Sequence, residues 1–299
     1  MRVLLTGGSG FVGSHLVAHL VAAGDEVTAL AGPDAGLPAG VARPVVDLAD
    51  RAGLAAALEG ADPEVVIHLA GLAHVGSSWQ QLAEYFQVNV LGTENVLAAA
   101  VGRRVVLASS GEVYGVVPED EQPIQEDRPL APASPYALTK AAAERLTVRE
   151  GGVVARLFNL VGPGQSATFA LPAFARQLAA IAAGEAEPQL KVGNLTPRRD
   201  FLHVADGARA LRVLAEKGAP GEAYNIASGQ ALSIEEALHL LTRIAGVEAE
   251  VTIDPERFRP ADIPLLTGDN ARLTALGWHQ ELSLGQALED LWHSLERPS

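Results

Sequence analysis

The chain has 299 residues, of which 48% are hydrophobic and 19% are charged, a composition that suits a folded α/β protein. Its net charge of −14 disfavours a nucleic-acid partner, because the overall field repels phosphates, and the absence of cysteine excludes disulfides, thiolate metal sites and thiol catalysis. No apolar run reaches the roughly 18 residues that span a bilayer, and the N-terminus lacks a signal-peptide pattern. We therefore expect a cytoplasmic protein with no bound metal and no membrane contact.

The first 160 residues alternate short β-branched runs with segments rich in Ala and Leu. The runs predict strands at 2–6, 26–30, 42–46, 64–69, 104–108 and 153–158. The segments between them predict helices near 12–23, 50–59, 79–100 and 135–149. Apolar strands that alternate with helices are typical of a parallel sheet covered on both faces. Residues 1–160 are therefore predicted to form a doubly wound α/β domain of the Rossmann type.

The second half is less regular and is punctuated by proline and glycine. Its patterns predict helices near 169–183, 206–217, 233–245 and 283–296. Strands are predicted at 189–192, 223–226 and 248–253. We expect residues 161–299 to form mainly a smaller, substrate-binding lobe, and we expect part of 200–230 to rejoin the first domain.

A glycine-rich loop follows the first predicted strand and precedes the first predicted helix. It reads Thr6-Gly7-Gly8-Ser9-Gly10-Phe11-Val12-Gly13. Gly7 permits a tight turn, Gly10 lets a pyrophosphate approach bare backbone, and Gly13 lets helix and strand pack closely. The pyrophosphate would bind the free N–H groups at the positive end of the helix dipole. The loop therefore predicts a dinucleotide site that includes Phe11 and Val12.

The end of the second predicted strand leaves the choice between NAD and NADP open. An acidic residue there would bind the ribose hydroxyls, and a basic residue would favour a 2′-phosphate. The sequence has Ala31-Gly32-Pro33-Asp34, in which Asp34 comes late and is equally well explained as a turn residue.

The segment Ser134-Pro135-Tyr136-Ala137-Leu138-Thr139-Lys140 predicts a helix start and a proton-transfer pair. Ser134 is a good N-cap, Pro135 suits the first helical position, and Tyr136 and Lys140 then share one face. A phenol titrates near 10, so favouring phenolate at neutral pH requires about 4 kcal/mol. A nearby ammonium and the positive charge of oxidised nicotinamide can supply it. Tyr136 would then be a general acid or base at a sugar hydroxyl or ketone, whereas an ordinary surface helix is the alternative.

A hydroxyl group is expected beside the reacting oxygen. The predicted strand at 104–108 is followed by Ser109-Ser110-Gly111-Glu112, at the carboxyl end of a strand, where ligands bind in open α/β sheets. Ser110 is therefore predicted to hydrogen-bond the substrate oxygen, although serines at strand ends are often only turn formers.

Taken together, these motifs resemble the extended short-chain dehydrogenase/reductase family over essentially the whole chain. Besides the glycine loop and the Ser110, Tyr136 and Lys140 set, the matching positions are Asp47, Leu48, Leu69, Ala70, Gly71 and Asn89. The resemblance implies that Ser110, Tyr136 and Lys140 are catalytic. It also implies that the glycine loop and the other matching positions line the cofactor or support the proton path, with Tyr136 and Lys140 contacting the cofactor as well.

The distal half looks like the GDP-4-dehydro-6-deoxy-D-mannose reductase branch of that family. The matching segments are 157–159, 162–166, 174–177, 192–195, 198–201 and 259–263. By that resemblance Asn159, Arg199 and Arg259 contact the diphosphate of a nucleotide sugar, and Arg176 helps to hold the base. In a chain of net charge −14, such guanidinium groups are the local positive charges that a diphosphate needs.

Glu112 bears on the type of reaction and is predicted as a catalytic or substrate-binding residue. In nucleotide-sugar 4,6-dehydratases a glutamate at this place takes a proton, and the residue before it is often an aspartate that releases water. Here that residue is Gly111, which cannot donate a proton, so simple reduction is favoured over elimination.

The leading hypothesis is NAD(P)H-dependent reduction of the 4-keto group of GDP-4-dehydro-6-deoxymannose to a GDP-6-deoxyhexose such as GDP-rhamnose. A 4-epimerase or a 4,6-dehydratase that retains NAD is the nearest alternative, and a non-catalytic dinucleotide sensor is a remote one. The resemblance also implies a homodimer that pairs helices 79–100 and 135–149 across a two-fold axis.

Overall fold

The first part of the molecule is built on a parallel β-sheet. The computed structural model describes residues 1–32, 36–257 and 263–296. Within these residues the sheet has six strands, in the order β2-β1-β3-β4-β5-β9, and every pairing is parallel. The strands are β1 (Arg2–Thr6), β2 (Glu26–Leu30), β3 (Val65–His68), β4 (Arg104–Ser110), β5 (Val153–Leu157) and β9 (Ala223–Ile226). The predicted doubly wound parallel sheet is thus confirmed.

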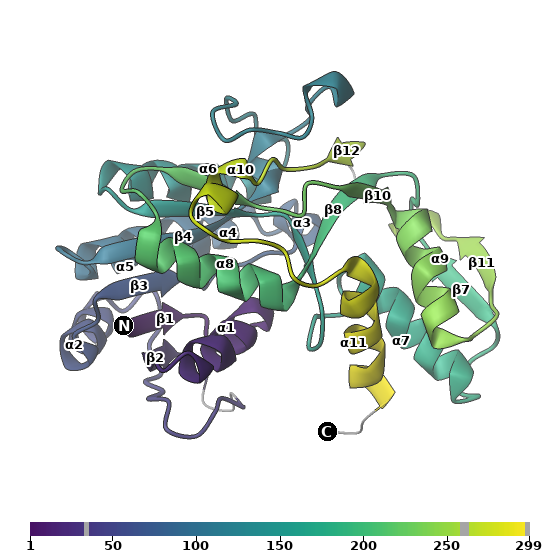
Figure 1. The fold of residues 1–299 in the computed structure, drawn as a ribbon, viewed down its shortest axis with the longest axis horizontal. Helices are drawn as coiled ribbons and strands as arrows, with labels where there is room; N and C mark the ends of the chain where they lie inside the picture. Colours follow the sequence, from purple (N-terminus) through teal and green to yellow (C-terminus); the bar gives the residue numbers. More distant parts are fainter. Residues whose placement is uncertain (33–35, 258–262, 297–299) are drawn as a thin grey trace.

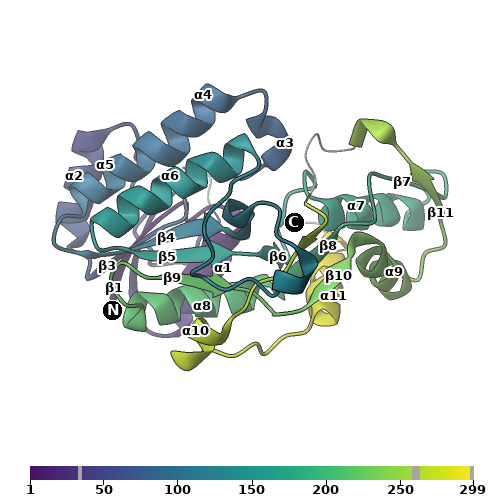
Figure 2. The ribbon, with the colours of Figure 1, turned by 90° about the horizontal axis from the view of Figure 1, so that it is seen from above.

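Helices cover both faces of this sheet (Figure 2). On one face α1 (Phe11–Ala22) packs against α8 (Val204–Lys217). On the other face α5 (Gly92–Ala99) packs between α2 (Arg51–Ala61) and α6 (Pro135–Arg149). The interiors of the strands are buried from both sides, which explains why their residues are mainly apolar.

The predicted strand at 42–46 is wrong. In the structure this segment contributes only an isolated bridge between Ala42 and Thr28. Pro44 has no N–H to donate to a ladder, and Arg43 and Val45 are exposed, so little apolar surface is gained by pairing here.

The predicted helix at 79–100 is confirmed in part, because it is interrupted by a wider turn. The chain forms α3 (Val75–Ser78) and α4 (Leu82–Tyr85) and then continues as a π-helical segment, η1 (Phe86–Leu91), into α5. A π-helical turn inserts a residue into the helix and is frequent at functional sites. Asn89 lies inside this segment and is buried.

The second part of the molecule packs three helices against short strands (Figure 1). The helices are α7 (Ala170–Ala182), α9 (Ile234–Ala245) and α11 (Leu284–Glu296). One small sheet contains β10 (Ala231–Ser233), β8 (Arg198–His203) and β12 (Leu265–Leu266), with β6 (Asn159–Val161) beside β8. A separate pair joins β7 (Gln189–Val192) to β11 (Glu250–Ile253). A core that includes Phe174, Leu178, Leu241 and Trp292 holds the helices together.

Three elements from the second half of the sequence lie in the first part of the molecule. Strand β9 pairs with β5 at the edge of the six-stranded sheet, and α8 packs on α1. After β9 the short helix α10 (Ala271–Ala275) also contacts that strand, and Leu273 and Trp278 belong to the core under the sheet. Among the residues that the structure describes, none of the helices has the length and apolar character needed to cross a membrane.

Candidate functional site

The glycine loop forms a cradle of backbone at the end of β1. Gly7 has φ +72°, and its carbonyl accepts a hydrogen bond from the Gly10 amide at 3.0 Å. A Cβ atom at position 13 would lie 2.1 Å from the Gly7 carbonyl oxygen, so only glycine allows this approach of helix and loop. A Cβ atom at position 10 would meet only that same oxygen within 4 Å, so one side of Gly10 faces open space.

The start of α1 offers the donors that an anion needs. Gly10 is its N-cap and contributes no side-chain hydrogen bond, so the first-turn amides, including those of Phe11 and Val12, have no partner within the helix. The cradle and the helix dipole therefore fit the pyrophosphate of a dinucleotide. The Leu30 carbonyl at the end of β2 accepts from the amides of Gly7 and Gly8, which ties the neighbouring strand to the loop. Asp34 falls outside the described residues.

Asp47 and Leu48 lie in the loop that precedes α2. Asp47 is exposed, and its carboxylate accepts from the Ala49 amide at 2.8 Å. Leu48 packs against Gly92 of α5, and its carbonyl accepts from the Asn95 side chain at 2.8 Å. Both residues thus have structural contacts, and their predicted role toward the cofactor stays a prediction.

The end of β3 brings further predicted residues against the glycine loop. A Cβ atom at position 7 would lie 2.7 Å from the Ala70 nitrogen, with Leu69 beside it, so loop and strand end are in backbone contact. A Cβ atom at position 71 would meet the Asn89 side-chain oxygen at 2.9 Å and the Lys140 Nζ at 3.3 Å. Gly71, Asn89 and Lys140 are therefore immediate neighbours.

The amide side chain of Asn89 is held from both ends. Its oxygen accepts from the Leu72 amide at 2.8 Å, and its nitrogen donates to the Leu72 carbonyl and to the Thr139 hydroxyl, both at 3.0 Å. The side chain thus links the segment after β3 to helix α6, at the level of Lys140.

Helix α6 begins as its sequence predicts. The Ser134 hydroxyl accepts from the Ala137 amide at 3.1 Å, and Pro135 occupies the first turn. Tyr136 and Lys140 are both buried. The Lys140 ammonium donates to the Ala108 carbonyl of β4 at 2.9 Å, and the Ser110 hydroxyl lies close enough to the Tyr136 phenol to lower its pKa. The three residues thus meet at the carboxyl end of β4.

Burial controls the ionisation of this group. It raises the pKa of Tyr136; the nearby Ser110 hydroxyl opposes the rise, and the charge of Glu112 adds to it. Burial also lowers the pKa of Lys140 to about 8, against the charge of Glu144 one turn later on α6. In the protein alone the phenol pKa therefore moves opposite to the direction expected from the spacing of Tyr136 and Lys140. A protonated phenol is the form that can give a proton to a substrate oxygen.

Glu112 lies close enough to Tyr136 for its charge to raise the pKa of the phenol. The backbone amide of Glu112 donates to the Ser110 hydroxyl at 3.2 Å. Gly111 between them is covered by the ring of Phe158, because a Cβ atom there would lie 3.0 Å from two of the ring carbons. An acidic side chain at position 111 would therefore require the Phe158 ring to shift by a few tenths of an ångström.

A cavity of about 530 Å³ lies between the two parts of the molecule, because His74, Gly76, Trp79 and Gln80 of the first part line it together with residues of the second part. Its volume is typical of a small-molecule site. Among the predicted substrate contacts, Asn159 and Arg199 line it, and Arg199 is buried and donates to the Ile263 carbonyl at 2.6 Å. Arg176 is exposed on α7 and is absent from the lining, while Arg259 falls outside the described residues.

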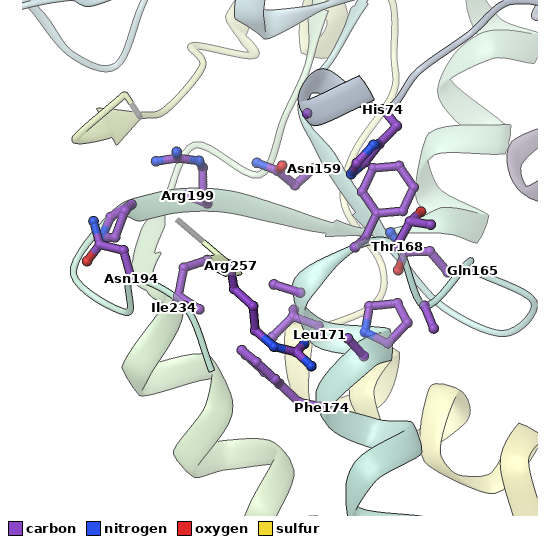
Figure 3. A pocket seen from close by; sticks show the side chains of 18 of the residues that line it. His74, Asn159, Gln165, Thr168, Leu171, Phe174, Asn194, Arg199, Ile234 and Arg257 are labelled. Carbon is purple, nitrogen blue, oxygen red and sulfur yellow. The ribbon is translucent and has the colours of Figure 1, made fainter. Parts of the chain in front are cut away.

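The cavity also contains residues that the sequence patterns did not single out. Figure 3 shows His74 and Gln165 on the side of Asn159, and Asn194 near Arg199. Arg257 enters the cavity toward Phe174 and pairs with Asp254 at 3.2 Å. Asn194 and Gln165 belong to segments that carried the resemblance, which is the only signal that pointed to them. Arg257 had none except its position two residues before Arg259.

Comparisons with known proteins agree with this geometry. Residues 4–291 match the family model described as GDP-mannose 4,6 dehydratase. The chain is 38% identical to GDP-6-deoxy-D-mannose reductase of Pseudomonas aeruginosa, over 99% of this chain and 98% of that protein. A solved structure of RMD from P. aeruginosa complexed with NADPH matches with TM-score 0.88 and 37% identity, covering 99% of both chains. UDP-glucose 4-epimerase from Thermus thermophilus, in complex with NAD, matches with TM-score 0.90 and 32% identity, again covering 99% of both chains.

These matches extend over nearly the whole chain and include both the six-stranded sheet and the segments that line the cavity. The resemblance drawn from the motifs is confirmed. The chain belongs to the GDP-mannose 4,6-dehydratase family of extended short-chain dehydrogenases/reductases.

Proposed function

We propose that this protein is an NAD(P)H-dependent reductase that converts the 4-keto group of a GDP-4-dehydro-6-deoxyhexose into the hydroxyl group of a GDP-6-deoxyhexose of the GDP-rhamnose type. The observation that carries the proposal is the buried meeting of Ser110, Tyr136 and Lys140 beside a backbone cradle for pyrophosphate. Full-length similarity to a GDP-6-deoxy-D-mannose reductase supports this choice of substrate. Relatives solved with NADPH and with NAD support a nicotinamide dinucleotide without favouring either form.

The bound dinucleotide supplies the hydride for carbon 4. Ser110 holds the ketone oxygen by a hydrogen bond, and Tyr136 gives that oxygen its proton as general acid. The raised pKa of Tyr136 keeps the phenol protonated at neutral pH, which suits the direction of reduction. Lys140 binds the ribose hydroxyls of the dinucleotide and keeps a positive charge beside the proton path.

The cavity is proposed to hold the nucleotide-diphosphate end of the substrate. Asn159 and Arg199 line its wall, and Arg257 adds a second guanidinium inside it. Two such groups offset the negative charge of a diphosphate and donate in fixed directions. Arg259, two residues after Arg257, is proposed as a further diphosphate contact, and Arg176 as a contact to the base.

An epimerase or a dehydratase that retains its cofactor is the second candidate, and the structural similarity to a 4-epimerase solved with NAD favours keeping it in view. Dehydration is disfavoured because the place of the water-releasing acid is taken by Gly111, packed under Phe158. A retaining enzyme holds NAD through the cycle, whereas a reductase exchanges it at each turnover. Extraction of the purified protein should therefore yield less than stoichiometric NAD(P), and stoichiometric NAD would favour the second candidate.

The decisive assay is oxidation of NADH and NADPH, run in parallel, with GDP-4-dehydro-6-deoxymannose. The proposal expects turnover with at least one of the two dinucleotides and a product that carries a 4-hydroxyl group. Turnover of a different sugar nucleotide, with none for this ketosugar, would refute it. Dinucleotide binding without turnover on any nucleotide sugar would instead support a sensor.

A homodimer through the helical segments 79–100 and 135–149 is also proposed. Large apolar side chains are exposed on both segments, among them Leu82, Phe86 and Leu138. Covering them in a two-fold interface would remove this apolar surface from water. Light scattering on the wild type and on Leu138→Asp tests this, with a dimer expected for the first and a monomer for the second.

A further inference from the structure

A buried histidine lies at the centre of a chain of hydrogen bonds beneath the candidate site. The Ala70 amide donates to the Thr6 hydroxyl at 3.2 Å, and the Thr6 oxygen lies 2.6 Å from Nδ1 of His68. On the other side of the ring, Nε2 lies 3.1 Å from the Thr93 hydroxyl, which donates to the Asn89 carbonyl at 2.6 Å. All the side chains that take part in this series of hydrogen bonds are buried.

The partners leave one arrangement of protons. The Asn89 carbonyl can only accept, so the single proton of the Thr93 hydroxyl points to it. His68 must then donate from Nε2 to the Thr93 oxygen, which leaves Nδ1 of the neutral ring as an acceptor for the Thr6 hydroxyl. Burial, reinforced by the charge of Lys140, lowers the pKa of His68 to about 3, which keeps the ring neutral.

The hydrogen bonds on each side of the His68 ring form two arms, one from Nδ1 through Thr6 and one from Nε2 through Thr93. Each arm ends on a backbone segment that takes part in the proposed site. The arm through Thr6 joins the residue before Gly7 to Ala70, and these are the two segments that are in backbone contact at the cradle. The arm through Thr93 holds the carbonyl of Asn89 in the π-helical segment, and the Asn89 side chain lies beside Lys140.

We propose that His68 is a positioning residue for the reaction: its Nδ1 arm through Thr6 sets the phosphate cradle, and its Nε2 arm through Thr93 sets Asn89 at the catalytic lysine. The inference rests on the proposed function as an NAD(P)-dependent reductase. Loss of the two arms should have different effects. The Thr6 arm supports dinucleotide binding, so its loss should change Kd, whereas the Thr93 arm supports the proton path, so its loss should change kcat.

The test separates the arms with four variants of the full-length protein. Thr6→Val should raise the Kd for the dinucleotide by about three- to tenfold, as expected for one lost hydrogen bond, with kcat nearly unchanged. Thr93→Val should lower kcat by a similar factor and leave Kd nearly unchanged. His68→Asn retains an acceptor near the place of Nδ1 and should behave like Thr93→Val. His68→Gln retains a donor near the place of Nε2 and should behave like Thr6→Val.

The readouts are Kd from nicotinamide fluorescence, kcat with the ketosugar and Tm for each variant. Thr147→Val is the matched control, since the buried Thr147 hydroxyl donates only to the Ala143 carbonyl within α6, at 2.9 Å. It should lower Tm without moving Kd or kcat. If the role of His68 is purely structural, all four variants should likewise show a lower Tm with unchanged Kd and kcat. Values of Kd and kcat within twofold of wild type in all four variants would therefore overturn the inference. A reversed pattern between His68→Asn and His68→Gln would also overturn it.

The experiments distinguish a wrong proposed function from a wrong inference about His68. If the wild type binds neither NADH nor NADPH, the proposed function is refuted and the inference falls with it. If the wild type binds a dinucleotide but does not turn over the ketosugar, only the substrate is wrong. The Kd values of Thr6→Val, His68→Gln and His68→Asn then still decide the inference, because binding requires no sugar.

Discussion

Replacing His68 with Gln should make the free energy of unfolding less sensitive to acid. The pKa of His68 is lowered by burial, and secondarily by Lys140, from 6.5 to about 3. Between these two values the unfolded chain binds one proton more than the folded chain at this residue. Stability therefore rises with pH in this window and is lost as the pH falls from about 6.5 toward 3.

The size of the effect follows from the same pKa values. At pH 5, which lies about 1.5 pH units below the ordinary value, each unit contributes about 1.4 kcal/mol, so the wild type loses about 2 kcal/mol relative to pH 7.5 from this residue alone. A group as buried as His68, at 1% exposure, has little solvent screening to reduce that figure. In His68→Gln this contribution is absent at every pH.

Urea unfolding of the wild type and of His68→Gln at pH 7.5 and pH 5.0 measures the difference. Other titrating groups, including the buried Asp200, contribute equally to both proteins and cancel. His68→Gln should lose about 2 kcal/mol less than the wild type between the two pH values, although it starts from a lower stability. Thr147→Val, which is destabilised without losing a titratable group, should keep the full dependence of the wild type. Equal pH dependence in the wild type and His68→Gln would refute the argument that the ring is neutral and buried.

Four further changes test the site and its support. Tyr136→Phe should lower kcat by about 10²- to 10⁴-fold while dinucleotide Kd stays near wild type, and full turnover would exclude a proton-donating role. Gly13→Ala should abolish dinucleotide binding measured by fluorescence, because the new Cβ meets the Gly7 carbonyl, whereas Gly60→Ala, which meets nothing within 4 Å, should bind normally. With wild type, kcat/KM for the dinucleotide should fall as the pH rises through about 8, where Lys140 loses its proton, and Lys140→Arg should remove that fall. Asp200→Asn should reduce stability in urea by about 1–3 kcal/mol, because the Asp200 carboxylate accepts from backbone amides that an NH₂ group cannot serve; an unchanged midpoint would contradict this.

Rules that depend only on neighbouring residues were sufficient to predict the elements that carry the proposed chemistry. Ser134 and Pro135 fix the start of α6 through its first turn, so the spacing of Tyr136 and Lys140 was enough to predict that both lie on one face. That this face is buried was not predicted. The glycine loop could likewise be predicted, because its requirements concern only neighbouring backbone.

The direction of the Tyr136 pKa could not be predicted in the same way. Spacing gives the distance to Lys140 along the helix, but the pKa depends on burial under residues that are far away in the sequence. The spacing therefore indicates that a positive charge lies near the phenol and would lower its pKa. It does not indicate that the phenol is buried, and burial raises the pKa.

Strand β8 was missed for a related reason. Its sequence begins Arg198-Arg199-Asp200, which reads as polar and exposed, yet Arg199 and Asp200 are buried. The Asp200 carboxylate accepts from the amides of Ser228, Gly229 and Gly268, and the Arg199 guanidinium donates to a carbonyl at position 263. Partners that far away leave no periodic signal in the sequence around the strand.

The return of α8 and β9 to the six-stranded sheet limits how this enzyme can be recombined with its relatives. A chimera with one junction near residue 160 would take its edge strand and one covering helix from a different parent than the rest of the sheet. Exchanging the second part of the molecule therefore requires the replacement of separate stretches of sequence before residue 204 and after residue 226, while residues 271–278 stay with the sheet. For the same reason, cleavage of a single surface loop between the two parts should leave fragments that stay interlocked rather than two independent domains.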